Sequence, residues 1–312
     1  MDFFKTTPKL DFMGKRRVAI GLSVVLFVLS FIAFATRGLN FGIDFTGGTL
    51  IEVAYDRVVD LGEVRKQLAA AGFDAAIVQH VGSAKGVIVR IPPRAGMQSV
   101  EISNRVLDAL KKDTPTTVEM RQVEFVGPQV GEELVEDGGL ALIFALFGIL
   151  VYVALRFELR LAVASVIATV HDLLLTTGLV SVLGLQFDLT MLAAILTVAG
   201  YSINDTIVVF DRIRENFRKL RRESPLEVMN RSINETLLRT LITGPTSLMV
   251  LTALYFLGGD VIDDFALTLI IGVVIGTFSS IYIASPIALL LGVSRTDLMP
   301  VKKEGLGVAE RP

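Results

Sequence analysis

Cysteine is absent from this 312-residue sequence, and histidine occurs only at His80 and His171. The first absence excludes disulfide bonds and thiolate metal sites, and two histidines do not favour a histidine-rich metal centre. Charged residues are also scarce, at 20%, and the net charge is -2, so nothing in the composition indicates a nucleic-acid partner. We therefore expect neither a metal nor an organic cofactor.

Hydrophobic residues, by contrast, make up 52% of the chain, which is more than one soluble core of this size requires. An apolar run of about 20 residues is long enough for a helix to cross a bilayer. Six such runs predict transmembrane helices at residues 18–36, 138–155, 161–183, 189–211, 237–257 and 265–291. The sequence thus predicts an α-helical polytopic membrane protein with six transmembrane helices.

The first apolar run also shares features with a secretory signal peptide. A basic cluster, Lys15–Arg17, precedes it, and it ends in the small-residue pattern Ala33–Ala35. However, the run is longer than the usual hydrophobic region of such peptides and is long enough to span a membrane. We expect an uncleaved first helix, with cleavage as the alternative.

Basic residues in the connections indicate how these helices are oriented, because Lys and Arg are retained on the cytoplasmic side. They occur before the first run, between the second and third runs, and densely at 212–222, whereas 184–188 and 258–264 contain none. We therefore expect the N-terminal segment 1–17, the loop 212–236 and the tail 292–312 to be cytoplasmic. Residues 37–137 would then form one domain outside the membrane.

The outer segment 37–137 alternates between strand and helix patterns. Period-two spacing predicts strands at 49–55, 75–82, 86–92 and 116–127, and helical spacing predicts helices at 60–73 and 99–112. The order βαββαβ is that of a ferredoxin-like α+β domain between the first two transmembrane helices. A short acidic helix at 128–139 should lead into the second span.

A capping box at Ser224–Glu227, with Pro225 at the first helical position, predicts a helix start within the loop 212–236. We expect a surface helix that runs from there towards Asn234.

Asp205 lies inside the fourth predicted span. At 1.5 Å per residue it is about 24 Å from the outer end at Leu189 and about 9 Å from Asp211. An ionised Asp at this depth is costly, so it should face the protein interior and find a partner or bind a proton. Tyr201 and Ser202, four and three residues earlier, extend a polar stripe on its face. The alternative is a polar contact that holds two helices together.

The fifth span offers a partner at a similar depth. Arg239 lies about 27 Å from the outer end of that span at Leu257, and Thr243 lies one turn further outward on the same face. A nearby guanidinium would hold Asp205 ionised, and its departure would favour proton binding. Alternatively, Arg239 extends to the cytoplasmic surface and has no such role.

His171 and Asp172 are adjacent near the middle of the third span. Two titratable residues at this depth could form a proton relay, and a structural contact between helices is the alternative. Adjacent helical positions point about 100° apart, so the two side chains need not act together.

A glycine-rich motif follows the first span. Paired glycines beside Asp and Thr permit positive φ angles and close backbone approach, which suits a tight junction with the outer domain. It lacks the Lys of a phosphate-binding loop, so it does not predict nucleotide binding. Its candidate residues are Gly42, Asp44, Thr46, Gly47 and Gly48.

Three segments of the sequence resemble the SecF family, and the likeness covers nearly the whole chain. They are GIDFTGGT at 42–49, GYSINDTIVVFDRIREN at 200–216 and RSINETLLRT at 231–240. This family comprises the smaller subunits of bacterial SecDF protein-export complexes and resembles half of an RND-superfamily transporter.

The resemblance implies a transport subunit of the bacterial inner membrane and not an enzyme. Its implied partners are SecD, the SecYEG translocon, YajC, membrane lipids and the unfolded exported polypeptide. In such a complex the proton gradient helps to complete export, with protons as the coupling ion. Asp205 would be the proton-responsive carboxylate, and Arg239 and Thr243 would be its partners. Because this chain contains no SecD half, a complete proton path would require the second subunit.

Two other functions stay open at this point. A small-molecule exporter of the RND type would need a duplicated half and an exterior substrate vestibule. An intramembrane hydrolase would need an activated nucleophile or paired carboxylates, for which Ser202, or Asp172 with Asp205, are the candidates.

Overall fold

The computed structural model describes residues 8–94, 96–112, 117–220, 222–259 and 262–294. Within them, six helices are long and apolar enough to cross a membrane. They are α1 (Arg16–Thr36), α5 (Pro128–Arg156), α6 (Leu159–Leu183), α7 (Leu189–Lys219), α8 (Pro225–Leu257) and α9 (Asp263–Ser279), the last continuing through η1 (Ser280–Ala284) into α10 (Ser285–Leu290). Each of the six predicted spans therefore corresponds to one of these helices.

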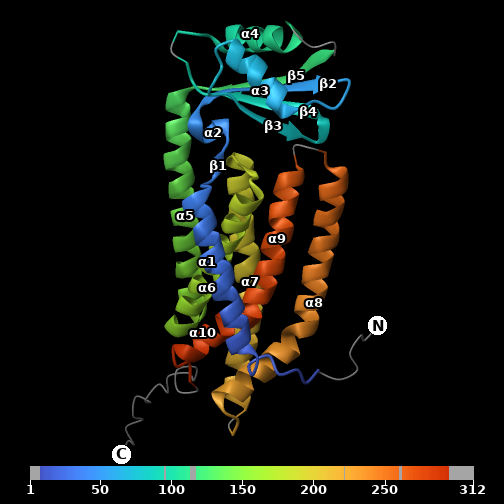
Figure 1. Cartoon of the computed structure of the whole chain (residues 1–312). Helices are drawn as coiled ribbons and strands as arrows, with labels where there is room; N and C mark the ends of the chain where they lie inside the picture. Colours follow the sequence, from blue (N-terminus) through green and yellow to red (C-terminus); the bar gives the residue numbers. More distant parts are fainter. Residues whose placement is uncertain (1–7, 95, 113–116, 221, 260–261, 295–312) are drawn as a thin grey trace, which may run out of the picture.

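The helices form a bundle (Figure 1), and they are buried to unequal extents. In α6, α7 and the span from α9 to α10, 50–56% of the residues in an 18-residue apolar stretch are buried. The corresponding share is only 6–11% in α1, α5 and α8. The latter three helices carry many exposed Leu, Val, Ile and Phe side chains. Such surfaces suit lipid tails or another apolar surface. The centre of the bundle is thus built by α6, α7 and α9.

Three helices are longer than the sequence predicted. The fourth span does not end at 211 but continues as α7 to Lys219, into the segment expected as a loop. The expected acidic helix at 128–139 and the second span form one helix, α5, which begins at Pro128. The expected surface helix after Ser224 does not end near Asn234 but continues as α8 through the fifth span. The capping box is confirmed, and because no proline or glycine separates the two predicted segments, nothing interrupts the helix between them.

A four-stranded antiparallel sheet lies at one end of the bundle (Figure 1). Its strands are β2 (Gly48–Tyr55), β3 (Ile77–Val81), β4 (Ser83–Ile91) and β5 (Val118–Val126), in the order β3-β4-β2-β5. The helices α3 (Leu61–Ala70) and α4 (Ser99–Lys112) contribute Leu68 and Val106 to the core formed with the sheet residues Ile51 and Val89. The order βαββαβ along the chain is the one that the periodicity predicted.

Two short strands connect the bundle with the sheet. β1 (Asn40–Phe41) pairs in parallel with β6 (Gln186–Phe187), which lies between α6 and α7. The short helix α2 (Ile43–Thr46) follows β1 and leads directly into β2. The chain therefore passes from the first span into the sheet along the start of α7.

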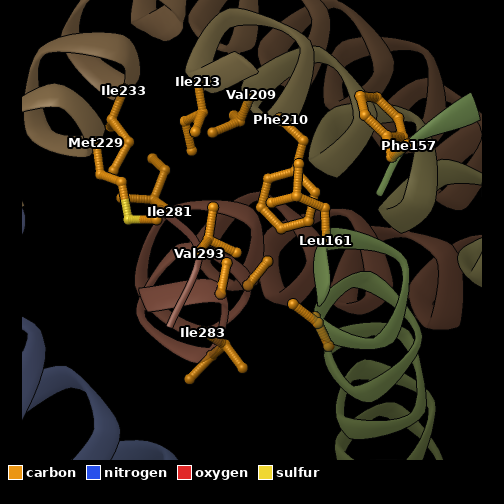
Figure 2. Packing of buried hydrophobic residues seen from close by; sticks show 14 of the residues in the cluster. Phe157, Leu161, Val209, Phe210, Ile213, Met229, Ile233, Ile281, Ile283 and Val293 are labelled. Carbon is orange, nitrogen blue, oxygen red and sulfur yellow. The ribbon is translucent and has the colours of Figure 1, made fainter. Parts of the chain in front are cut away.

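At the other end of the bundle a hydrophobic cluster joins α5, α6, α7, α8, η1 and α10. Figure 2 shows Leu161 of α6, Phe210 of α7, Met229 of α8 and Ile281 of η1 among the side chains of this cluster. All four side chains are at least nine-tenths buried. This packing fixes α7 and α8 at the end of the bundle away from the sheet, close to the polar residues that the two helices share.

Candidate functional site

Asp205 occupies the middle of α7 and is only 7% exposed. Thr240 Oγ1 of α8 donates to one carboxylate oxygen at 3.1 Å, and Ser280 Oγ of η1 donates to the other at 2.7 Å. A hydroxyl group can donate to a carboxylate and can also accept from a carboxylic acid. The surroundings of Asp205 therefore fit both of its protonation states.

Arg239 lies beside this site without touching the carboxylate. Its charge acts on Asp205 through space, but in the part of the chain that the structure describes Arg239 forms no ion pair. The direct ion pair between Asp205 and Arg239, which their similar depth predicted, is thus not present among the described residues. Adjacent helical residues point about 100° apart, so Arg239 is turned to the exposed surface when Thr240 faces Asp205.

Thr243, the third predicted residue, is half-buried one turn beyond Arg239. Its carbonyl oxygen accepts from Thr246 Oγ1 at 3.0 Å. Among the described hydrogen bonds, none joins the Thr243 side chain to Asp205. The structure therefore brings Asp205 together with Thr240 instead.

The polar stripe predicted on α7 divides between two neighbouring helices. Ser202 is fully buried, and its hydroxyl donates to Asp172 of α6. Tyr201 instead lines a cavity of about 440 Å³ between α7, α8 and α9, together with Thr197, Thr246 and Ser247. Because residues 201 and 202 point in different directions, α7 presents polar groups to α6 on one side and to α8 on the other.

Asp172 is fully buried where three helices meet. His171 Nδ1 lies 2.8 Å from one of its oxygens, and Ser202 contacts the other. The second ring nitrogen of His171 contacts Ser23 Oγ on α1. His171 and Asp172 thus act together, in a hydrogen-bonded chain that links α1, α6 and α7.

These hydrogen-bonded side chains test the alternative that the protein is an intramembrane hydrolase. A serine nucleophile needs a base that takes its proton, and in a serine–histidine–carboxylate triad the imidazole stands between the other two groups. Here the order of contacts is Ser202, Asp172, His171, with the serine on the carboxylate. The imidazole does not reach Ser202, so this candidate nucleophile has no base. His171 instead stands between Ser23 Oγ and Asp172, which is the order of contacts in a serine–histidine–carboxylate triad.

Sequence reasoning missed Thr240 and Ser280, the two hydroxyl partners of Asp205. Ser280 belongs to η1, a π-helical turn that comes shortly before Pro286, which has no N–H to donate. The serines at 279, 280 and 285 next to this proline are the signal in the sequence that could have identified it. Thr240 carried no signal beyond its place next to Arg239.

The glycine-rich motif forms the expected junction, although its centre is the helical turn α2. Thr46 Oγ1 donates to the carbonyl oxygen of Gly42 at 3.0 Å, and Asp44 accepts from the N–H of Leu189, the first residue of α7, at 3.0 Å. Gly47 and Gly48 have φ angles of 66° and 124°, which favour glycine. The junction therefore includes the start of α7 as well as the first strand of the sheet.

Asp188 caps the same end of α7, where it accepts from the N–H of Met191 at 2.8 Å. Burial raises the pKa of Asp188; the bond from Met191 opposes this shift, and the nearby carboxylate of Asp44 adds to it. Two carboxylates thus lie at the positive end of the α7 helix dipole.

Two family models match this chain. One, described as protein export membrane protein SecD/SecF, C-terminal, matches residues 106–294, and the other, the SecD/SecF GG motif, matches residues 32–57. The protein translocase subunit SecF of Vibrio alginolyticus is 49% identical over 310 residues, which cover 99% of this chain and 98% of that protein. That of Escherichia coli O157:H7 is 45% identical over 303 residues, which cover 97% and 94%.

Solved structures give the same relationship. A crystal structure of SecDF from Thermus thermophilus, titled a translocon-associated membrane protein, matches 92% of this chain with a TM-score of 0.84 and 38% sequence identity. SecDF in its super-membrane-facing form matches the same share with a TM-score of 0.67. This chain spans 39% of the length of those SecDF chains.

Proposed function

The chain belongs to the SecF family of protein translocase subunits, and from this premise we propose that it couples the proton gradient to late stages of Sec-dependent protein export. It is a multi-pass membrane protein and a transport component, and the family and the SecDF structures support SecD as its partner. In this proposal protons are the coupling ion, and Asp205 is the group that binds and releases them.

The observation that carries the proposal is the environment of Asp205. A buried carboxylate that is held by two hydroxyls, with an arginine nearby but unpaired, has no fixed counter-ion. The free energies of its charged and neutral states are then set by how close Arg239 comes. Proton binding would release Arg239, and approach of Arg239 would expel the proton, so the positions of α7 and α8 would follow the protonation of Asp205.

The proposal includes an orientation. The density of basic residues in the last turns of α7 and just after it supports cytoplasmic termini, and the sheet domain would then lie on the periplasmic side of the bacterial inner membrane. The order βαββαβ along the chain supports a ferredoxin-like α+β unit, which we propose takes part in movement of the emerging polypeptide. SecYEG, YajC and the unfolded exported chain are the further partners in this account.

The test compares precursor export in membrane vesicles that contain this chain and SecD, with and without a proton gradient. Asp205→Asn should abolish the gradient-dependent part of export at equal membrane abundance. Asp211→Asn is the matched control, because Asp211 lies on the same helix but is exposed and paired with Arg156 at 2.5 Å. If Asp205→Asn responds to the gradient as the wild type does, Asp205 is a packing residue and the proposal is wrong.

A further inference from the structure

The glycine-rich segment from Gly42 to Gly48 touches two helices that are distant in sequence. The N–H of Gly42 donates to the carbonyl oxygen of Phe187 at 2.8 Å, and Asp44 accepts from Leu189 at the start of α7. On its other side the segment packs against the start of α5, where Gly131 approaches Gly47. One short segment therefore holds the outer ends of α5 and α7 together.

The same segment is continuous with the sheet. Gly48 is the first residue of β2, and it pairs with Val126 of β5. Arg90 of β4, which is 4% exposed, donates to Asn40 Oδ1 and to the carbonyl oxygen of Phe41, both at 3.1 Å. Burial lowers the pKa of Arg90, and the charge of Asp188 opposes this shift. The sheet is thus tied to β1 by a buried cation.

The contacts around this joint leave no space between backbones. A Cβ atom on Gly47 would lie 3.0 Å from the Cα atom of Pro128, the first residue of α5, and one on Gly131 would lie 2.9 Å from the backbone nitrogen of Gly47. Backbone atoms cannot rotate away as a flexible side chain can. These parts are therefore in direct contact, with little freedom to shift relative to one another.

Three phenylalanines fill the space between β1, α2 and β6. The ring centroids of Phe41 and Phe187 are 5.8 Å apart, those of Phe45 and Phe187 are 5.9 Å apart, and those of Phe41 and Phe45 are 6.1 Å apart. Aromatic pairs at these separations attract one another beyond their burial of apolar area. The cluster adds side-chain packing to the backbone contacts of the joint.

From these contacts we propose that the joint makes the sheet domain and the outer ends of α5 and α7 one rigid body, and that Asp44 is the positioning residue that connects α7 to it. This inference rests on the proposed function, because α7 carries Asp205 about 24 Å from Leu189. A displacement of α7 that starts at Asp205 then reaches the sheet domain directly. The domain follows α7 and does not swing on a flexible linker.

A disulfide across the joint tests its rigidity. Because this sequence has no native cysteine, the introduced thiols are the only ones that it carries. Phe41 and Phe187 are partners in the parallel pair of β1 and β6, so Phe41→Cys with Phe187→Cys places two thiols side by side. In complexes that contain SecD, gradient-dependent export should be equal before and after oxidation, with each single variant as a control. Loss of export on oxidation that a reductant reverses would show that the joint must open, and would overturn the proposal.

A second pair of variants tests Asp44. Asp44→Ala removes the acceptor for the Leu189 N–H, whereas Asp44→Asn keeps an acceptor oxygen in its place. Asp44→Ala should lose most of the gradient-dependent export while proton flux through the complex continues. Asp44→Asn should export precursor as the wild type does. If flux and export fall together in Asp44→Ala, or if both variants equal the wild type, Asp44 does not connect α7 to the domain.

These outcomes can be separated from those of the proposed function. If Asp205→Asn leaves export unchanged, the proton-coupling role of Asp205 fails. The disulfide experiment still decides whether the joint is rigid, since it reads export itself, whichever group responds to the gradient.

Discussion

Asp205 and Asp172 are both buried carboxylates within the helix bundle, yet their surroundings differ. Asp172 is fully buried, and it contacts an imidazole and a serine that connect α1, α6 and α7. Asp205 is slightly exposed and accepts hydrogen bonds from two hydroxyls. One of these hydroxyls is on α8, in which only 11% of the apolar stretch is buried. One carboxylate is enclosed by the centre of the bundle, and the other lies at its open side.

This difference separates a structural role from a coupling role. A carboxylate enclosed between α6 and α7, two of the most buried helices, cannot change its contacts without disturbing both of them. A carboxylate that faces a weakly buried helix can do so at the cost of two hydrogen bonds. We therefore assign proton coupling to Asp205 and helix attachment to Asp172, and the following variants test that assignment.

The largest difference between the two carboxylates should appear in stability. Asp172→Ala leaves His171 Nδ1 and Ser202 Oγ without their partner, and each buried group left unsatisfied costs about 1–3 kcal/mol. Asp205→Ala should cost less, because Ser280 Oγ also donates to the carbonyl oxygen of Thr277 at 3.0 Å. Thermal unfolding of the purified complex should show a clearly lower midpoint for Asp172→Ala than for Asp205→Ala.

An equal or reversed order of midpoints would contradict the assignment of Asp172 to helix attachment. His171→Ala serves as the companion variant. It removes the contact with Ser23 on α1 but keeps that of Asp172 with Ser202, so its midpoint should lie between those of the wild type and Asp172→Ala.

Arg239 should affect coupling and leave stability unchanged. It is exposed and forms no ion pair within the described part of the chain, so Arg239→Gln removes a charge near Asp205 without breaking a contact. We expect gradient-dependent export to fall while the free energy of unfolding stays within about 0.5 kcal/mol of that of the wild type. Arg231→Gln, an exposed position on the same helix that pairs with Glu223 and Glu235, is the control for loss of a positive charge.

The alternative that Arg239 merely extends to the membrane surface makes the opposite prediction. In that case Arg239→Gln and Arg231→Gln would export precursor equally well, and Asp205 would work without an arginine.

The smallest effect concerns the two threonines near Asp205. Thr240→Val removes a hydrogen bond to the carboxylate while keeping the shape of the side chain, at a cost of about 1 kcal/mol. Thr243→Val removes a hydroxyl that does not contact Asp205 in the structure. We expect Thr240→Val to change the size of the proton gradient that is needed for half-maximal export. Thr243→Val should need the same gradient as the wild type. A larger shift for Thr243→Val would mean that the two helices rearrange before Asp205 reacts.

The sequence contained the elements of this fold but not the contacts between them. Apolar runs predicted the six spans, periodicity predicted the order βαββαβ, and the capping box predicted the start of α8, because each is a local property of the chain. Asp205 was identified by its depth in an apolar run. Its actual partners, Thr240 and Ser280, depend on how α8 and η1 are rotated against α7, which no local pattern specifies.

The junction illustrates the same limit. Paired glycines predicted a tight turn at Gly47 and Gly48, and both have positive φ angles. The bond from Leu189 to Asp44 joins residues that are far apart in sequence, so it could be found only from the packed structure.

Infrared difference spectroscopy on the purified complex with SecD would test the central claim most directly, since it detects the C=O stretch of a protonated carboxyl group. Spectra would be recorded across a pH step for the wild type, Asp205→Asn and Asp172→Asn. The account predicts a carboxyl band that changes with pH in the wild type, is lost in Asp205→Asn and persists in Asp172→Asn. A band that persists in Asp205→Asn and disappears in Asp172→Asn would contradict it, and would make Asp172 the carboxylate that exchanges protons.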